Sequence, residues 1–488
     1  MTNSQGKARR IAVVGGGVSG LAAAYFLARA RREGAPVEEF LIEARERLGG
    51  VIRTETVEGF LIEGGPDSFL AEKPEAADLC RGLGLGDSLM GSNDDERRTY
   101  ILLGGRLVPL PDGLMLLVPT RLWPVMTTPL LSLRSKISMA AEWFTPPRPE
   151  NADQAADDSV GNFVRRHFGE AMLENIADPL LAGVYGGDSA ALSVRSVLPR
   201  FWEMEKQYGS LTRGTLEAMR KRRAPSLNTN QSAPQGLPLF MTLKEGLQRI
   251  VEQMEVTLEK SRVHLRQKVA ALKTTSSREA GRYTVRCDGG TVFSADAVVL
   301  AMPAYEGAKL LSPVDAEAAD LLNAIPYSSS MTVSLGYESA AALQLPPGFG
   351  FLAPQKENRR LLACTFVHGK FPHRAPEGKA LLRCFLGGSR DPEVLRLDDV
   401  EVSALVRREL REILGLSAQP RFCRIYRWPA SMPQYVVGHA KRIRKLNARL
   451  ENHPGLFLAG NAFSGIGISD CVRTGKAAAD DVLRFLGR

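Results

Sequence analysis

The chain has 488 residues, of which 44% are hydrophobic and 24% are charged, and its formal net charge is +9. At roughly 100–200 residues per domain this length favours two to four folded domains, and the composition excludes a wholly disordered chain. The positive charge fits an anionic partner and equally a solvated surface with spare lysine and arginine. Nucleic acid is not an expected partner, because no basic stripe is interleaved with aromatic residues and no zinc-finger spacing occurs.

The cysteines and the N-terminal segment indicate in which cellular compartment the protein is expected. The six cysteines include no C-x-x-C pair, so neither a metal site nor a dithiol redox motif is expected. Lys7, Arg9 and Arg10 precede an apolar run that looks like a signal peptide, but this run contains glycines at a nucleotide-binding spacing. No apolar stretch reaches the ~20 residues of a membrane-spanning helix. We therefore expect a cytoplasmic protein.

Residues 11–43 have the pattern of a strand, a tight turn, a helix and a second strand. The turn carries G-x-G-x-x-G at Gly15, Gly17 and Gly20, and Glu43 ends the second strand. In a dinucleotide-binding βαβ unit such glycines allow the turn, the approach of the pyrophosphate and close helix packing, while the acid binds a ribose 2′-OH. A carboxylate there repels a 2′-phosphate, which argues against NADP. The predicted loop contacts are Gly15, Gly16, Gly17, Val18, Ser19 and Gly20.

Residues 100–144 are apolar, interrupted by prolines and dotted with arginine and lysine. This texture fits a surface that docks onto a membrane without crossing it, and it also fits the helical core of a substrate domain. Further on, residues 159–168 and 173–181 have helical spacing, with Ser159 as a candidate N-cap. Residues 223–236 are polar turn formers and predict a loop. Strand-like segments follow at 263–265, 283–286, 297–301 and 331–337, and a last strand and helix begin near residue 456.

The residues after Glu43 separate FAD from NAD. The stretch after the second strand has an R-x-G-G pattern and contains Arg45, Arg47, Gly49, Gly50 and Arg53. It resembles the glycine doublet of the flavin amine-oxidase superfamily, which contacts the phosphates and ribityl chain of the cofactor. Further resemblances lie at Val269, at 298–303 and at 458–468, so that the similarity covers almost the whole chain and implies FAD as cofactor. Beyond the glycine loop and Glu43, the residues that the resemblance assigns to FAD are Ala44, Arg47, Gly50, Val51, Gly65, Pro66, Asp67, Ser68, Val269, Trp428, Gly460, Asn461, Ile466, Gly467 and Ile468.

Three local stretches, Glu63–Phe69, Pro179–Asp188 and Arg427–His439, together resemble the oxygen-dependent porphyrinogen oxidases of haem biosynthesis. The resemblance implies an α/β fold, with a Rossmann-like FAD-binding domain, a mixed-sheet substrate domain and a mainly helical, membrane-associated insertion. The expected boundaries are 1–95, 237–308 and 426–488 for the FAD-binding domain, 96–222 for the helical substrate and membrane-associated domain, 223–236 for a flexible loop and 309–425 for the substrate-domain sheet.

The reaction that this resemblance implies is the oxidation of a porphyrinogen to a porphyrin. Six electrons leave the macrocycle, two in each flavin cycle, with oxygen as acceptor and hydrogen peroxide as product. The cofactor performs the difficult step, and the protein positions the macrocycle and keeps the site dry. We therefore expect no catalytic side chain and no metal, and we interpret His439 as a structural residue.

The identity of the porphyrinogen depends on a few residues. Family members that act on protoporphyrinogen often place an arginine before the strand that corresponds to residues 100–103, where this chain has Thr99, with Arg98 just outside. Lys73 matches a substrate-binding lysine of the coproporphyrinogen-oxidising relatives. Coproporphyrinogen has four propionates, which suits cationic residues. Lys73, Arg98 and Thr99 are thus the predicted substrate contacts, coproporphyrinogen III is favoured over protoporphyrinogen IX, and no role in the fold is expected for Lys73.

Two functions of other classes stay open at this point. An amine or polyamine oxidase would share the fold but would lack the three stretches. A non-enzymatic nucleic-acid or membrane scaffold would use the basic charge alone. For the porphyrinogen oxidase, the expected partners are the porphyrinogen, molecular oxygen, an anionic membrane touched peripherally on its inner face, and another haem-pathway enzyme that receives the product.

Overall fold

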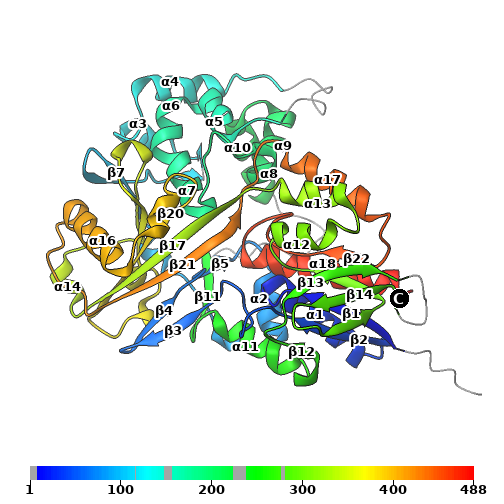
Figure 1. Ribbon diagram of the computed structural model, residues 1–488. Helices are drawn as coiled ribbons and strands as arrows, with labels where there is room; N and C mark the ends of the chain where they lie inside the picture. The colour runs from blue at the N-terminus through cyan, green and yellow to red at the C-terminus, as the bar shows by residue number, and fades with distance from the viewer. Residues whose placement is uncertain (1–7, 116, 148–156, 224–237, 276–280, 488) are drawn as a thin grey trace, which may run out of the picture.

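A computed structural model describes residues 8–115, 117–147, 157–223, 238–275 and 281–487, and the predicted loop at 223–236 lies outside these ranges from residue 224 onward. The first part of the fold is a five-stranded parallel sheet in the order β12-β2-β1-β16-β22 (Figure 1). Its strands are β12 (Val263–His264), β2 (Val37–Ile42), β1 (Arg9–Val14), β16 (Ala297–Leu300) and β22 (Leu456–Leu458). These strands come from three distant parts of the chain, as the predicted FAD-binding segments require.

The parallel sheet is buried on both faces, as is typical of an α/β fold. On β1, Ile11 and Val13 belong to one apolar cluster, while Ala12 and Val14 belong to the cluster on the opposite face. Two helices and a small antiparallel sheet are its main covering elements. These are α1 (Val18–Arg32) and α18 (Ile468–Phe485), with the sheet formed by β13 (Val269–Thr274), β14 (Tyr283–Cys287) and β15 (Val292–Ala295).

A seven-stranded mixed sheet forms the second part, in the order β21-β17-β20-β19-β18-β7-β8 (Figure 1). Its strands are β21 (Phe422–Pro433), β17 (Tyr327–Tyr337), β20 (Ala380–Gly387), β19 (Leu361–Phe366), β18 (Gly350–Leu352), β7 (Thr99–Leu103) and β8 (Arg106–Pro109). One face packs on α16 (Asp399–Leu414). Strand alternation sends Val333 and Cys384 to that face and leaves Thr332 and Arg383 on the other.

The helical insertion lies between β8 and the segments that return to the parallel sheet. Its helices enclose an apolar cluster that includes Phe163, Phe168 and Trp202. Its helices are α3 (Leu122–Thr127), α4 (Leu133–Glu142), α5 (Val160–Phe168), α6 (Glu170–Met172), a π-helical turn (Leu173–Ala177), α7 (Asp178–Tyr185), α8 (Val194–Val197), α9 (Pro199–Tyr208) and α10 (Leu211–Arg223). The helix expected at 159–168 is confirmed, because Ser159 Oγ accepts a hydrogen bond from the Asn162 amide at 3.1 Å.

Shorter elements connect these three parts. They include β3 (Thr54–Val57), β4 (Phe60–Glu63), β5 (Phe69–Leu70), α2 (Glu75–Gly82), β6 (Leu89–Gly91), β9 (Leu114–Met115), β10 (Val118–Pro119), β11 (Phe240–Leu243), α11 (Gln248–Thr257), α12 (Ala304–Leu311), α13 (Ala316–Asn323), α14 (Ala340–Leu343), α15 (Val367–Lys370) and α17 (His439–Leu450). Among the described residues, no helix has the length and apolar character needed to cross a bilayer.

The expected α/β class, with a parallel and a mixed sheet, is confirmed, but two expected boundaries differ from the strand pairing. Residues 96–109 were expected in the helical part, yet β7 and β8 pair within the seven-stranded sheet. The boundary at 425 cuts β21, which pairs continuously with β17 apart from one bulge. The reason in both cases is long-range hydrogen bonding, which local sequence texture does not encode.

A buried histidine joins three helices of the insertion. His167 on α5 lies 3.2 Å from Glu142 at the end of α4 and 3.1 Å from Glu205 on α9. Arg166 also binds Glu205 at 2.8 Å and extends to Asp158. Burial alone lowers the pKa of His167, but its hydrogen bonds to the two carboxylates outweigh burial and raise this pKa above its ordinary value. Each carboxylate in turn has a lowered pKa, because its hydrogen bonds to His167 and other donors outweigh burial.

The histidine cluster predicts a pH dependence of stability. A raised pKa in the folded state means that the folded protein holds the His167 proton more tightly than the unfolded chain does. The stabilisation is therefore complete below about pH 6.5, the ordinary histidine pKa, and is lost as the pH rises through the folded-state value. We expect the Tm of the wild type to fall between pH 6 and 9 more steeply than that of His167→Gln. Parallel Tm curves for the two proteins would contradict this.

Candidate cofactor and substrate site

The glycine loop after β1 is shaped by close backbone contacts. Gly15 has φ of +109° and its amide donates to the Ile42 carbonyl at 2.8 Å. A Cβ at Gly15 would lie 2.7 Å from the Ala301 carbonyl oxygen, and one at Gly20 would lie 1.8 Å from the Gly15 oxygen. Both positions therefore require glycine for the fold itself, before any ligand is considered.

Gly17 is different, because its surroundings are open. It is the N-cap of α1 with φ of −71°, which any residue can adopt, and a Cβ there would meet no atom within 4 Å. The space lies at the N-terminus of a fifteen-residue helix, where amides and the helix dipole favour a phosphate. Glu43 stands beside this loop, since its carboxylate accepts from the Gly16 amide at 2.6 Å and from the Arg45 amide at 2.8 Å. The loop and the acid expected for a dinucleotide are thus brought together.

An arginine-rich cavity of about 350 Å³ lies between the glycine doublet and β21. Arg45, Arg47, Arg53 and Arg427 line it together with Val51. Trp428 also lines this cavity. Two of the four arginines have carboxylate partners, since Arg427 pairs with Asp399 and Arg53 pairs with Glu55.

Within this cavity, Arg47 serves the protein backbone. Its guanidinium donates to the carbonyl oxygens of Leu48, Gly50 and Ile52 at 2.7–3.1 Å, so it holds the glycine turn in shape. Arg45 and Arg53, which the sequence analysis placed in the same stretch, also line this cavity.

The segment before Val269 runs beside the acid at the end of β2. The Gln267 amide donates to the Glu43 carbonyl at 2.9 Å, and the Arg266 amide donates to the Arg45 carbonyl at 3.0 Å. Val269 begins β13 two residues later. The predicted adenine-side residue is thus close to the predicted ribose-binding acid, although the two are more than two hundred positions apart in the sequence.

The N-terminus of α18 lies at the same edge of the parallel sheet as that of α1, because both helices follow the carboxyl ends of parallel strands. A Cβ at Gly475 would lie 2.2 Å from the Ser19 carbonyl oxygen, so the two helices cross in close contact. Gly460, Asn461, Ile466, Gly467 and Ile468 lie on the approach to α18 and in its first residue.

The expectation that Lys73 has no role in the fold is wrong. Its Nζ forms an ion pair of 2.6 Å with Asp470 in the first turn of α18, and its carbonyl accepts from Ser469 Oγ at 3.1 Å. A carboxylate in a first helical turn is stabilised by the backbone amides, and the lysine compensates its charge. The Lys73 side chain is still 43% exposed, so it also has a solvent-facing side near α18.

The end of β21 connects all three stretches that resemble porphyrinogen oxidases. Trp428 Nε1 donates to the Gly64 carbonyl at 2.8 Å, and Gln434 Nε2 donates to the Tyr185 carbonyl at 2.8 Å. Tyr435 donates to the Asn461 carbonyl at 2.5 Å and accepts from the next loop, at the Gly465 amide. Residues that are distant in the sequence thus meet at one place.

His439 lies behind Tyr435 and stacks on it, with ring centroids 4.2 Å apart and planes 10° apart. Burial lowers the pKa of His439 to about 4, so the ring is neutral at neutral pH. Stacking and burial agree with the structural role expected for this residue.

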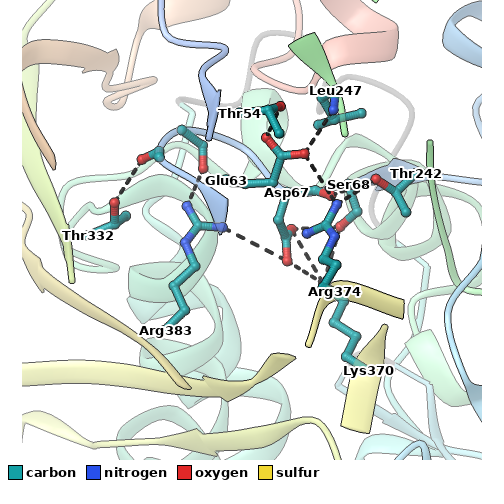
Figure 2. Close-up of polar contacts among 12 residues, drawn as sticks. Thr54, Glu63, Asp67, Ser68, Thr242, Leu247, Thr332, Lys370, Arg374 and Arg383 are labelled. Carbon is teal, nitrogen blue, oxygen red and sulfur yellow. Dashed lines mark hydrogen bonds and ion pairs between the residues drawn. The ribbon is translucent and has the colours of Figure 1, made fainter. Parts of the chain in front are cut away.

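A buried charge cluster lies between the segment 63–68 and the mixed sheet (Figure 2). Lys370 Nζ is 3.1 Å from Asp67, and Arg383 on β20 is 3.9 Å from the same carboxylate. Arg374 donates to the Asp67 carbonyl at 2.8 Å and is 3.4 Å from Glu63. Burial alone raises the pKa of Asp67, but the nearby cations outweigh it and hold this pKa well below its usual range.

Sequence reasoning missed the three cations of this cluster. It selected Asp67 and Ser68 from the resemblance, but Lys370, Arg374 and Arg383 stand in segments with no recognised motif. A basic residue at Arg383, within an otherwise apolar strand, was the only local signal. Burial raises the pKa of Glu63, an effect that Arg374 partly offsets.

Arg98 and Thr99 occupy a different part of the molecule from Trp428. Arg98 is exposed and its carbonyl accepts from the Phe349 amide at 2.7 Å. Thr99 begins β7, five strand positions from β21, which corresponds to about 24 Å at the usual strand spacing. The structure therefore does not gather these two residues with Trp428, whereas Lys73 lies at α18.

The contrast between Gly15 and Gly17 predicts how two variants differ. Gly17→Val fills only the open space at the α1 N-terminus, so we expect a folded protein with an unchanged Tm of the FAD-free form and little bound FAD. Gly15→Val would strike the Ala301 carbonyl and is expected to lower the Tm of the FAD-free form as well. Flavin absorbance per protein and thermal melting measure both effects. A Gly17→Val protein that purifies with full flavin content would refute the placement.

Comparison with known proteins agrees with this geometry. Residues 18–483 match the model of the flavin-containing amine oxidoreductase family. The coproporphyrinogen III oxidase of Bacillus subtilis is 35% identical over 99% of both chains. Protoporphyrinogen oxidase 1 of Arabidopsis thaliana chloroplasts is 30% identical over 98% of this chain and 88% of its own.

Among solved structures, a candidate protoporphyrinogen oxidase from Exiguobacterium sp. 255-15 superposes with a TM-score of 0.83 at 32% identity, covering 98% of this chain and 99% of its own. The family match, the near-full-length relatives and the converging glycine, arginine and β21 contacts agree with one another. The chain therefore belongs to the flavin-containing amine oxidoreductases, as an FAD-dependent oxidoreductase of the porphyrinogen oxidase group.

Proposed function

We propose that this protein oxidises coproporphyrinogen III to coproporphyrin III. The observation that carries the proposal is the 35% identity to the coproporphyrinogen III oxidase of Bacillus subtilis over almost the whole of both chains. The absence of an arginine at Thr99 supports the same choice. In the balanced reaction the macrocycle loses six hydrogens, and three molecules of oxygen become three of hydrogen peroxide. Protoporphyrinogen IX is the second candidate, favoured by the similarity to the Arabidopsis enzyme.

In this proposal FAD supplies the hydride acceptor, and the chain's own residues bind and orient it. Gly17 and the α1 N-terminus face the pyrophosphate, Glu43 faces a ribose, and the arginine-rich cavity offers counter-charges. Gly15 and Gly20 shape the loop, as Arg47 shapes the glycine doublet. The remaining proposed FAD contacts are Gly16, Val18, Ser19, Ala44, Gly50, Val51, Gly65, Pro66, Asp67, Ser68, Val269, Trp428, Gly460, Asn461, Ile466, Gly467 and Ile468.

Lys73 is the proposed contact for a substrate propionate. Its ammonium group forms an ion pair with Asp470, and the side chain is partly exposed. It can therefore donate hydrogen bonds to a substrate carboxylate while it keeps the contact with α18. Arg98 and Thr99 stay proposed substrate contacts. Because they are distant from Trp428 on β21, they would contact the edge of a large macrocycle that lies away from Trp428.

We also propose a peripheral membrane contact through the helical insertion, with the protein working on the cytoplasmic face of an anionic membrane. Helices α3 and α4 lie at the end of the molecule away from the parallel sheet (Figure 1). Several large apolar side chains on these helices and just after α4 are exposed, with Trp123 at 78%, Leu133 at 72% and Phe144 at 81%. Arg134 is exposed on the same helix as Leu133. Apolar side chains beside cations are typical of interfacial attachment. Transfer of the porphyrin product to another haem-pathway enzyme is compatible with a position on the membrane surface.

The substrate proposal is tested by turnover of both porphyrinogens side by side, followed by porphyrin fluorescence. We expect a higher kcat/KM for coproporphyrinogen III, and a decrease of roughly tenfold or more in Lys73→Met, because a charge-assisted contact contributes about 1.5–3 kcal/mol. The decrease should appear mainly in KM. Thr99→Arg should improve turnover of protoporphyrinogen.

Because Lys73 also pairs with Asp470, a control separates substrate binding from the fold. Asp470→Asn breaks the ion pair but keeps the ammonium group, so it should retain most of the affinity for coproporphyrinogen. A Lys73→Met variant with wild-type kinetics, in an enzyme that prefers protoporphyrinogen, would reverse the ranking of the two substrates.

Membrane attachment is tested by flotation with vesicles of phosphatidylglycerol and phosphatidylcholine. At low salt we expect the wild type to float and the double variant Leu133→Ser, Phe144→Ser to stay behind. Val400→Ser, which removes an equally exposed apolar side chain from α16, is the matched control and should float as the wild type does. Wild-type protein that stays at the bottom of the gradient would exclude the attachment.

A further inference from the structure

Three adjacent strands of the mixed sheet each contribute one side chain that donates to one of two neighbouring carbonyl groups, those of Gly64 and Gly65. Thr332 on β17 donates to the Gly64 carbonyl at 2.7 Å, and Trp428 on β21 donates to it at 2.8 Å. Arg383 on β20 donates to the next carbonyl, that of Gly65 (Figure 2). Two of these donors are neutral, and the third is a cation that is only 4% exposed.

The cluster around Arg383 does not balance its charges. Lys370, Arg374 and Arg383 are three cations, whereas Glu63 and Asp67 are two carboxylates, so that the surplus is one positive charge. Proton uptake by Glu63 would enlarge this surplus. The Nε atoms of Arg374 and Arg383 are buried and have no hydrogen-bond partner within the described part of the chain.

Each of the three cations has a carboxylate neighbour, but Lys370 and Arg383 share that of Asp67. Buried positive charge that is not fully compensated is costly, so its retention points to an anion that the polypeptide itself lacks. The segment next to the cluster indicates which anion. A Cβ at Gly65 would lie 1.8 Å from the Val51 carbonyl, so Gly65 packs directly against the glycine-doublet segment. The strand that follows, β5, packs on α18, and Asp67 lies between these two contacts. The surplus charge is therefore beside the segment 65–68 that we assign to FAD.

We propose that Arg383, with Lys370 and Arg374 in support, is an electrostatic positioning residue for the flavin: it holds the segment 64–67 in place and supplies the positive charge that balances the negative charge entering the isoalloxazine ring on reduction. This inference rests on the proposed placement of residues 65–68 against FAD. Arg383 is bound to Gly65 and Asp67 and acts through them and through its field.

The test uses the purified enzyme with its FAD and sulfite as the probe, in the absence of porphyrinogen. Sulfite adds to N5 of oxidised flavin and leaves a negative charge on the ring, so its Kd reports the local field. Arg383→Met should raise the sulfite Kd at least tenfold, which corresponds to about 1.4 kcal/mol and to a two-electron midpoint potential lower by about 30 mV. Arg383→Lys keeps the charge and should recover most of the affinity.

Two further variants separate charge from geometry. Thr332→Val removes a neutral hydrogen bond to the Gly64 carbonyl, so it should leave the sulfite Kd within about twofold of the wild type. Asp67→Asn removes a carboxylate and raises the positive surplus by one charge. It should therefore lower the sulfite Kd, whereas Arg383→Met raises it. If Arg383→Met loses its FAD, the Asp67→Asn measurement decides.

An unchanged sulfite Kd in FAD-replete Arg383→Met, or an equal shift in Thr332→Val, would overturn the inference and leave the FAD placement intact. An unchanged Kd in Asp67→Asn would overturn it as well. Failure of the FAD placement would appear differently, as full flavin content in Gly17→Val.

Discussion

The contact between the carbonyl groups of residues 64–65 and the mixed sheet is the interaction on which the rest of this structure depends. The segment 63–68 is continuous with the glycine-doublet segment of the FAD-binding part, and it is bound by Thr332, Arg383 and Trp428 from three adjacent strands. A buried carbonyl must find a donor, and here all the donors come from the other part of the fold. The position of the mixed sheet relative to the glycine loop is thereby determined.

β21 extends the same constraint towards the helical insertion. Gln434, directly after this strand, binds the Tyr185 carbonyl at the end of α7, and Tyr435 binds the loop that leads into α18. Because one strand contacts the FAD-binding part, the mixed sheet and the insertion, a shift in any of these parts would affect the others. A large macrocycle held against a flavin requires such a rigid frame, since most of the catalytic contribution of the protein is orientation and exclusion of water.

Electrostatics follow from this architecture. Strand alternation turns one face of the mixed sheet towards α16 and the other towards residues 63–68, so that a single arginine in an apolar strand is buried between two parts of the protein. The cations that surround Asp67 are distant in the sequence, and only the fold gives them a common neighbour. The same reasoning explains Lys73, whose partner Asp470 lies almost four hundred residues away.

The sequence alone determined the βαβ unit, the FAD assignment and the family, because local backbone requirements leave local signatures. A tight turn at Gly15 needs a positive φ, a helix N-terminus needs small residues, and both are visible within a few positions. Ser159 likewise identified a helix start. The tertiary structure alone decided that β7 and β8 join the mixed sheet, that Lys73 is paired with Asp470, that Arg47 supports the glycine turn and that three cations surround Asp67. These features depend on hydrogen bonds and charge pairs between distant segments, and no local pattern of residues records which distant group a buried polar side chain will meet.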